Sequence, residues 1–175
     1  MFPTLSTVSF DAVLPLSCAH SDEAVPLLRW QHEARLLLRI LTAPAVNQHD
    51  DDGQTRLEAK LDLSVYLQLL AQLDPNLPDC ACRVGMEEIA WQSTVPDDLA
   101  VGDRVVVKLL LDPQWPLPVH LPLVIIEKTI HTETAYPVLC GQIVADFWDE
   151  SLQAVWEKWV FSRHRQGIRR PPSRT

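Results

Sequence analysis

Residues 104–126, RVVVKLLLDPQWPLPVHLPLVII, decide the fold class of this chain. Two runs rich in Val, Leu and Ile, at 104–111 and 119–130, flank a proline-rich stretch at 112–118. Runs of this length and composition predict β-strands, and the prolines between them predict a turn. Further strand-like runs lie at 81–93 and 138–144. Short strands separated by turns that contain Pro and Gly predict an antiparallel barrel or sandwich.

The sequence before this section changes from a strand-like segment at 5–17 to the apolar spacing of helices. A first predicted helix has a seam of residues three or four positions apart: Leu27, Trp30, Ala34, Leu37 and Leu41. A second predicted helix, at 56–73, has a seam of the same spacing: Ala59, Leu63, Tyr66, Leu70 and Leu73. This second helix is more apolar than one packing face requires. A third helix is predicted from about residue 149, and one of its faces carries Trp148, Trp156 and Trp159.

The surplus apolar surface of the first two helices has two interpretations. In one, helices from several chains pack together, and the two seams form the interface of a homo-oligomer, for which a tetramer is a natural size. In the other, the two helices form a hairpin that packs on the barrel of its own chain.

Composition and charge exclude several functions. The chain has 175 residues, of which 47% are hydrophobic and 22% charged, as expected for a globular domain with an elaboration. Its net charge is −8, and the chain is acidic apart from a basic C-terminal tail. This charge distribution argues against nucleic acid as a partner. No apolar run approaches the roughly 18 residues of a membrane helix, and the N-terminus lacks the basic start of a secretory signal. We therefore expect a cytoplasmic protein without membrane insertion.

The strand section resembles a PilZ domain in the order and spacing of its segments. These segments are Ile89-Ala90-Trp91, VGD at 101–103, VVVKLLL at 105–111, LPLVII at 121–126, GQIVADF at 141–147 and VFSRHRQGIRR at 160–170. The resemblance covers about residues 79–170 and implies an α+β fold. In this fold an antiparallel PilZ-like β-barrel and a C-terminal helix are formed by residues 1–20 and 76–175. The heptad-like helices of residues 21–75 are then an insertion after the first barrel strand.

PilZ domains of the usual kind are receptors for cyclic di-GMP. The resemblance implies two binding elements, an R-x-x-x-R stretch ahead of the first strand and a [DN]-x-S-x-x-G loop. Alignment on Ile89 puts Arg83 where Asp or Asn is expected, Gly85 in place of Ser, and Glu88 in place of Gly. Glu87 and Glu88 add negative charge beside the expected phosphate, and the N-terminal MFPTL contains no Arg. We therefore expect no tight binding of cyclic di-GMP in the family's usual mode.

Two functions are compatible with these features. The first is a non-enzymatic module that contacts an unidentified signalling protein in a bacterial cyclic di-GMP-type pathway. The alternative is a receptor for cyclic di-GMP or another anion. Its candidate binding residues are the loop arginine and the C-terminal cluster: Arg83, Arg163, Arg165, Arg169 and Arg170.

No catalytic or metal-binding constellation stands out in the sequence. The cysteines lack the spacing of a zinc site and are expected to be buried thiols: Cys18, Cys80, Cys82 and Cys140. The six histidines are scattered singly, and no nucleophile or dinucleotide motif is present. We therefore expect no metal, no cofactor and no enzymatic activity.

Overall fold

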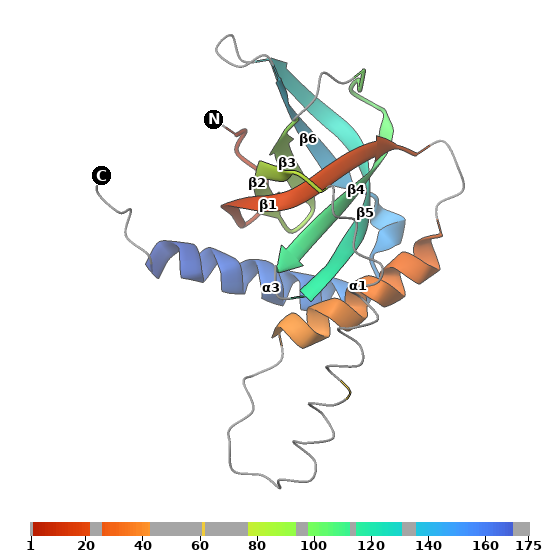
Figure 1. Ribbon diagram of the computed structural model, residues 1–175, viewed down its shortest axis with the longest axis vertical. Helices are drawn as coiled ribbons and strands as arrows, with labels where there is room; N and C mark the ends of the chain where they lie inside the picture. Colours follow the sequence, from red (N-terminus) through yellow and green to blue (C-terminus); the bar gives the residue numbers. More distant parts are fainter. Residues whose placement is uncertain are drawn as a thin grey trace, which may run out of the picture.

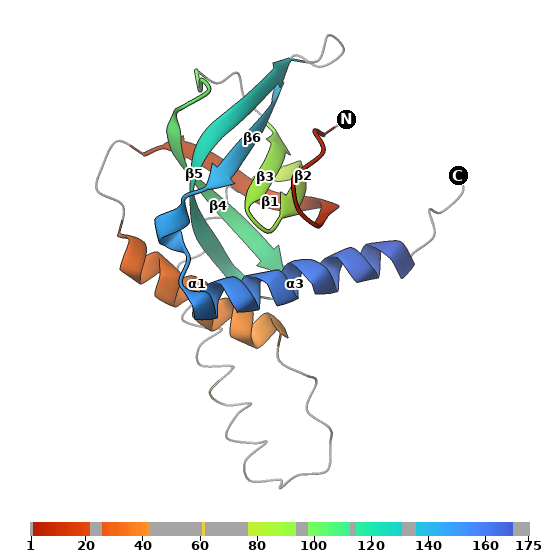
Figure 2. The ribbon, with the colours of Figure 1, turned by 180° about the vertical axis from the view of Figure 1, so that it is seen from behind.

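The computed structural model describes residues 2–21, 26–42, 61, 77–93, 98–112, 115–130 and 136–169. Within these residues, six strands form a barrel, and two long helices lie side by side across one end of it (Figures 1 and 2). The strands are β1 (Ser9–His20), β2 (Asp79–Gly85), β3 (Glu88–Gln92), β4 (Arg104–Asp112), β5 (Trp115–Ile130) and β6 (Pro137–Ile143). The barrel is closed in the order β1-β2-β3-β6-β5-β4, and all its strand pairs are antiparallel. This confirms the barrel that the sequence predicts.

Strand β4 shows why this sequence forms a barrel. Its side chains alternate along the whole strand, so that every second one is buried. The buried set is Val105, Val107, Leu109 and Leu111, each at most 1% exposed. The period of two places one face of the strand in the core, and the β-branched residues suit the pleated backbone.

The proline-rich stretch differs from the prediction. Residues 112–118 were expected to form a turn, whereas β5 begins at Trp115 and pairs with β4 from there onward. The second neighbour, β6, joins β5 only at Leu123, so the first part of β5 has a strand on one side only. Proline is tolerated in such a position because its missing N–H leaves no strand bond unmade.

Two α-helices and a short 3-10 helix complete the described fold. They are α1 (Leu27–Thr42), η1 (Ala145–Phe147) and α3 (Glu150–Arg169). Helix α1 packs against α3 and β5, and it buries Ala34, Leu37 and Leu38. Helix α3 buries Trp156 and Trp159 in the same core cluster as the barrel interior. Both helices therefore belong to the barrel's core instead of forming a separate body.

Polar contacts fix the start of α3. The Asp149 carboxylate accepts hydrogen bonds from the Leu152 N–H, at 2.9 Å, and from the Ser151 hydroxyl, at 2.8 Å. Asp149 therefore acts as the N-cap, and these bonds lower the pKa of its carboxyl. From α1, Arg35 forms an ion pair with the same carboxylate, and Gln31 donates to the Phe147 carbonyl at 3.1 Å.

The layout places the helical segment within the barrel sequence. The chain leaves the barrel after His20, forms α1, and returns at Asp79 beside β1. The second predicted helix, at 56–73, lies outside the described residues except for Leu61, which is helical and 57% exposed. The seam of Ala59, Leu63, Tyr66, Leu70 and Leu73 therefore stays a prediction.

Candidate functional site

Arg83 occupies the position at which the nucleotide loop is expected, and its guanidinium is fully engaged. Its Nε and Nη2 donate to the two carboxylate oxygens of Asp11, at 2.6 and 2.9 Å. Its Nη1 donates to the main-chain carbonyls of Pro3, at 2.9 Å, and Phe2, at 3.3 Å. The Arg83 hydrogen bond is the main reason that the pKa of Asp11 is lowered. The guanidinium is thus satisfied by its own chain, which leaves it little capacity to bind a phosphate.

The segment before β1 covers the turn between β2 and β3. Leu5 is buried, and its Cδ1 lies 3.0 Å from the place that a Cβ on Gly85 would occupy. The Ser6 N–H donates to the Glu88 carboxylate at 3.0 Å, and the Met86 N–H donates to the Thr7 hydroxyl at 3.1 Å. Gly85 is therefore used for close packing against Leu5, a role that its absence of side chain permits.

The inner side of the same turn is held by α3. The Trp156 indole N–H is shared between the carbonyls of Met86, at 3.0 Å, and Gly85, at 3.2 Å. Trp156 is itself 1% exposed. The turn is therefore fixed from both sides, and Glu87 is left as its exposed charge. An exposed carboxylate at this turn repels a phosphate group.

The structure separates the predicted arginine cluster into different roles. Arg163 is half-buried, and its Nη2 donates to Asp112 at 3.0 Å and to the Leu111 carbonyl at 3.3 Å. Its guanidinium also lies 5.8 Å from the centre of the Trp159 ring. Arg165 is exposed on α3, and no contact between described residues joins it or Arg163 to Arg83. The side chains of Arg169 and Arg170 lie outside the described residues.

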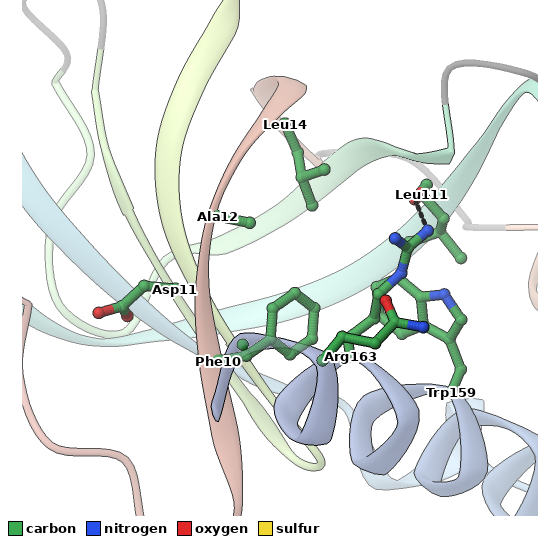
Figure 3. Close-up of a pocket in the computed structure, with 9 residues that line it drawn as sticks. Phe10, Asp11, Ala12, Leu14, Leu111, Trp159 and Arg163 are labelled. Carbon is green, nitrogen blue, oxygen red and sulfur yellow. Dashed lines mark hydrogen bonds between the residues drawn. The ribbon is translucent and has the colours of Figure 1, made fainter. Parts of the chain in front are cut away.

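A groove opens between β1 and α3, beside Arg163 (Figure 3). Its volume is about 490 Å³, within the usual range of 300–1,000 Å³ for ligand sites. Phe10 and Trp159 meet edge to face at its inner end, with ring centres 5.4 Å apart. Its lining residues are Phe10, Asp11, Ala12, Leu14, Leu111, Trp159, Arg163, Gln166 and Gly167. Sequence analysis did not identify this groove, because it depends on where two strands stop pairing.

The α1 seam faces its own chain. Ala34 and Leu37 are each 1% exposed, while Leu27, Trp30 and Leu41 are partly buried and pack on the core. The α1 seam is therefore covered by α3 and β5 of the same chain. The outward apolar residues of α1 are instead Leu28, which is 83% exposed, and Leu36, which is 50% exposed.

One histidine forms a cluster that the sequence did not reveal. His120 on β5 stacks on Trp30 of α1, with ring centres 5.1 Å apart and an interplanar angle of 13°. Its Nδ1 is buried without a hydrogen-bond partner among the described residues, and the Glu33 carboxylate lies 3.9 Å away. Burial is the main cause of a lowered His120 pKa. This ring therefore docks α1 on the barrel in its neutral form.

Three of the four cysteines are buried thiols, as expected, namely Cys80, Cys82 and Cys140, whereas Cys18 is only half-buried. None of the four forms a disulfide, and burial raises the pKa of Cys80 to about 11 and those of Cys82 and Cys140 to about 12. Thiols with such pKa values carry almost no reactive thiolate at neutral pH. Among the described residues, no group of His, Cys, Asp and Glu side chains is placed to hold a metal ion. None of the described helices has the length and apolar character needed to cross a bilayer.

Comparison with known proteins supports the fold. No protein-family model matches the chain, and no curated protein matches it. Among solved structures, it is similar to a protein from Xanthomonas campestris described as a new tetrameric PilZ domain self-assembled via an unusual helical bundle. The TM-score is 0.75 at 20% sequence identity, over 94% of this chain and 92% of that chain. The α+β architecture is therefore that of a PilZ domain.

Proposed function

We propose that this chain, which has the PilZ fold, is a non-enzymatic signalling module that acts by protein–protein contact in a bacterial cyclic di-GMP-type pathway. The observation that carries this proposal is the use of Arg83 within the chain. Its guanidinium binds Asp11 and two main-chain carbonyls, so the expected nucleotide position offers carboxylates instead of a cation. A module that keeps the fold and lacks the ligand's contacts is suited to bind other proteins.

We also propose that the chain self-associates, and that the tetramer is its working form. The similar protein is itself described as a tetramer self-assembled via a helical bundle, and the likeness covers 94% of this chain. Because the α1 seam is covered by α3 and β5, the interface uses the opposite side of α1, with Leu28 and Leu36, together with residues 56–73. Leu28 and Leu36 are exposed apolar side chains that a helical bundle would bury, and the sequence at 56–73 is rich in Leu.

The alternative function, an anion receptor, has less support. It needs a guanidinium group that is available at the expected nucleotide position, and Arg83 is engaged there by Asp11 of the same chain. Breaking such a pair to bind a phosphate exchanges one charged hydrogen bond for another, so little binding free energy is gained.

Isothermal titration of the full chain with cyclic di-GMP at low salt tests the loss of the nucleotide site. We expect no saturable heat up to about 100 μM ligand. A dissociation constant near or below about 1 μM would contradict the proposal. In that event, the double variant Arg165→Ala with Arg169→Ala should be titrated in the same way. Loss of nucleotide binding with an unchanged circular dichroism spectrum would favour the receptor function instead.

A further inference from the structure

The first half of β1 has one strand neighbour instead of two. Residues Ser9–Pro15 pair with β2, and pairing with β4 begins only at Leu16, opposite Leu109. Beyond Leu109 the two strands separate, and α3 crosses the gap with Trp159 and Arg163. The groove of Figure 3 lies in this gap, so one of its walls is an unpaired strand edge.

The hydrogen bonds of β1 show which main-chain groups face the gap. The Leu16 N–H donates to Pro78 on the β2 side, whereas the Ser21 N–H donates to Arg104 on the β4 side, each at 3.0 Å. Because main-chain directions alternate along a strand, odd-numbered residues of β1 point their N–H and C=O groups toward the β4 side. Asp11 and Val13 therefore direct both groups into the gap.

The main-chain groups of the neighbouring odd-numbered residues, Ser9 and Pro15, need no partner strand in the gap. The Ser9 carbonyl lies 2.6 Å from His164 Nδ1 on α3. Pro15 has no N–H, which suits a position on the unpaired side of a strand. The main chains of Asp11 and Val13 make no hydrogen bond across the gap to any described residue. Two residues of strand edge are thus left with donors and acceptors that face the gap between β1 and β4, and Asp11 also lines the groove.

The floor of the groove is apolar. The even-numbered side chains Phe10, Ala12 and Leu14 line it from β1, and Leu111 and Trp159 complete it (Figure 3). A strand added at Asp11 and Val13 would turn alternate side chains toward this floor, because successive side chains point to opposite faces. When a peptide binds by strand addition, main-chain hydrogen bonds supply the affinity, and the apolar floor of the groove selects the peptide's side chains.

The end of the groove next to α3 carries side-chain hydrogen-bond donors. Arg163 uses only its Nη2 in hydrogen bonds with described residues, and Gln166 lies one turn further along the helix. The helix carries no acidic residue after Glu157. The two aspartates near the groove, Asp11 and Asp112, are each paired with an arginine. An acidic side chain is therefore the complement of this end.

We propose that the groove binds an extended segment of a partner protein, which adds as a strand to the Asp11–Val13 edge and places an acidic side chain beside Arg163 and Gln166. The inference rests on the proposed function only in that the partner is a protein. It names the surface used, and this surface is separate from the α1 side assigned to self-association.

Selection of a random peptide display library against the full chain tests this inference, followed by fluorescence anisotropy of the enriched peptides. We expect peptides with alternating apolar residues and an acidic residue near one end. Val13→Pro removes an N–H from the gap without removing a bond to β2, and Gln166→Glu replaces an amide donor with a negative charge at the end of the groove next to α3. Each change should weaken binding by about tenfold or more.

Two matched variants serve as controls. Val13→Thr keeps the main-chain N–H, and Ala154→Glu adds the same charge at an exposed position earlier on α3. Both should bind as the parent chain does. If Val13→Pro unfolds the barrel, Gln166→Glu still tests the inference, because the Gln166 side chain is exposed and its replacement should leave the fold intact.

Absence of enriched peptides, or enriched peptides that bind Gln166→Glu as tightly as the parent, would overturn the inference. Enrichment of acidic peptides that lack the alternating pattern and tolerate Val13→Pro would also overturn it, because such peptides bind the charge without the strand edge. None of these results changes the oligomeric mass or the nucleotide titration. Failure of the groove is therefore distinguishable from failure of the proposed function.

Discussion

Arg83 shows how the role of a cation depends on the residue that faces it. In sequence it is an isolated arginine at the position of a nucleotide loop. In the structure it lies opposite Asp11, because the register of β1 and β2 places these two residues side by side. The sequence predicts that the usual cyclic di-GMP motif is missing. It does not reveal the ion pair, because register across 72 positions is a tertiary property.

His120 leads to a prediction of pH dependence. Glu33 and Arg29 face it from α1 and Lys108 from β4, and burial is the main cause of its lowered pKa. Its pKa is then lower in the folded chain than in the unfolded chain, so protonation favours unfolding. The stability contribution is present above the unfolded pKa of about 6.5 and is lost as the pH falls through the folded value.

We therefore expect the free energy of unfolding to decrease between about pH 7 and pH 5, and His120→Phe to remove part of this decrease. Phenylalanine keeps a ring against Trp30 and removes the unpartnered Nδ1. Urea denaturation at several pH values measures the effect, with His32→Gln, at an exposed α1 position, as the control. Equal pH profiles for the parent and His120→Phe would contradict this explanation.

At the scale of elements, runs of Val, Leu and Ile predict strands well, whereas prolines hide them. β4 is evident from its apolar run at 104–111, and the structure confirms it with one extra residue. The start of β5 is missed because Pro116 and Pro118 indicate a turn in isolation. They are accommodated because β6 does not reach that part of β5. The number of neighbours that a strand has is not encoded in its own residues.

The unpaired edge of β1 predicts an alternating pattern of hydrogen exchange. The amides of Ala12 and Leu14 face β2 and should be protected, whereas those of Asp11 and Val13 face the gap and should exchange faster. Amide exchange measured by NMR on the free protein resolves the four positions. Uniform protection from Phe10 to Leu14 would show that the edge is already paired.

At the scale of the molecule, the resemblance in segment order predicts the barrel and the place of α1 in the chain. β1 and β2 pair with each other although α1 lies between them in the sequence. The spacing of the α1 seam shows that this face is buried, although it does not show what covers it. A heptad pattern fits an oligomer and an intramolecular contact equally well, and here α3 and β5 cover the α1 seam.

The groove was not predictable at any of these scales. It forms where β1 and β4 separate and α3 crosses, so its residues come from three elements distant in sequence. Phe10, Leu14 and Trp159 each have the pattern of a core residue. Their arrangement around a gap depends on the closure of the whole barrel.

The central claim is that association with proteins, and not nucleotide binding, defines the working state of this molecule. Light scattering of the full chain at micromolar concentration, without and with about 100 μM cyclic di-GMP, tests it most directly. We predict a mass of four chains of 19.8 kDa each, unchanged by the nucleotide. A mass of one chain, or a mass that changes when cyclic di-GMP is added, would contradict the claim.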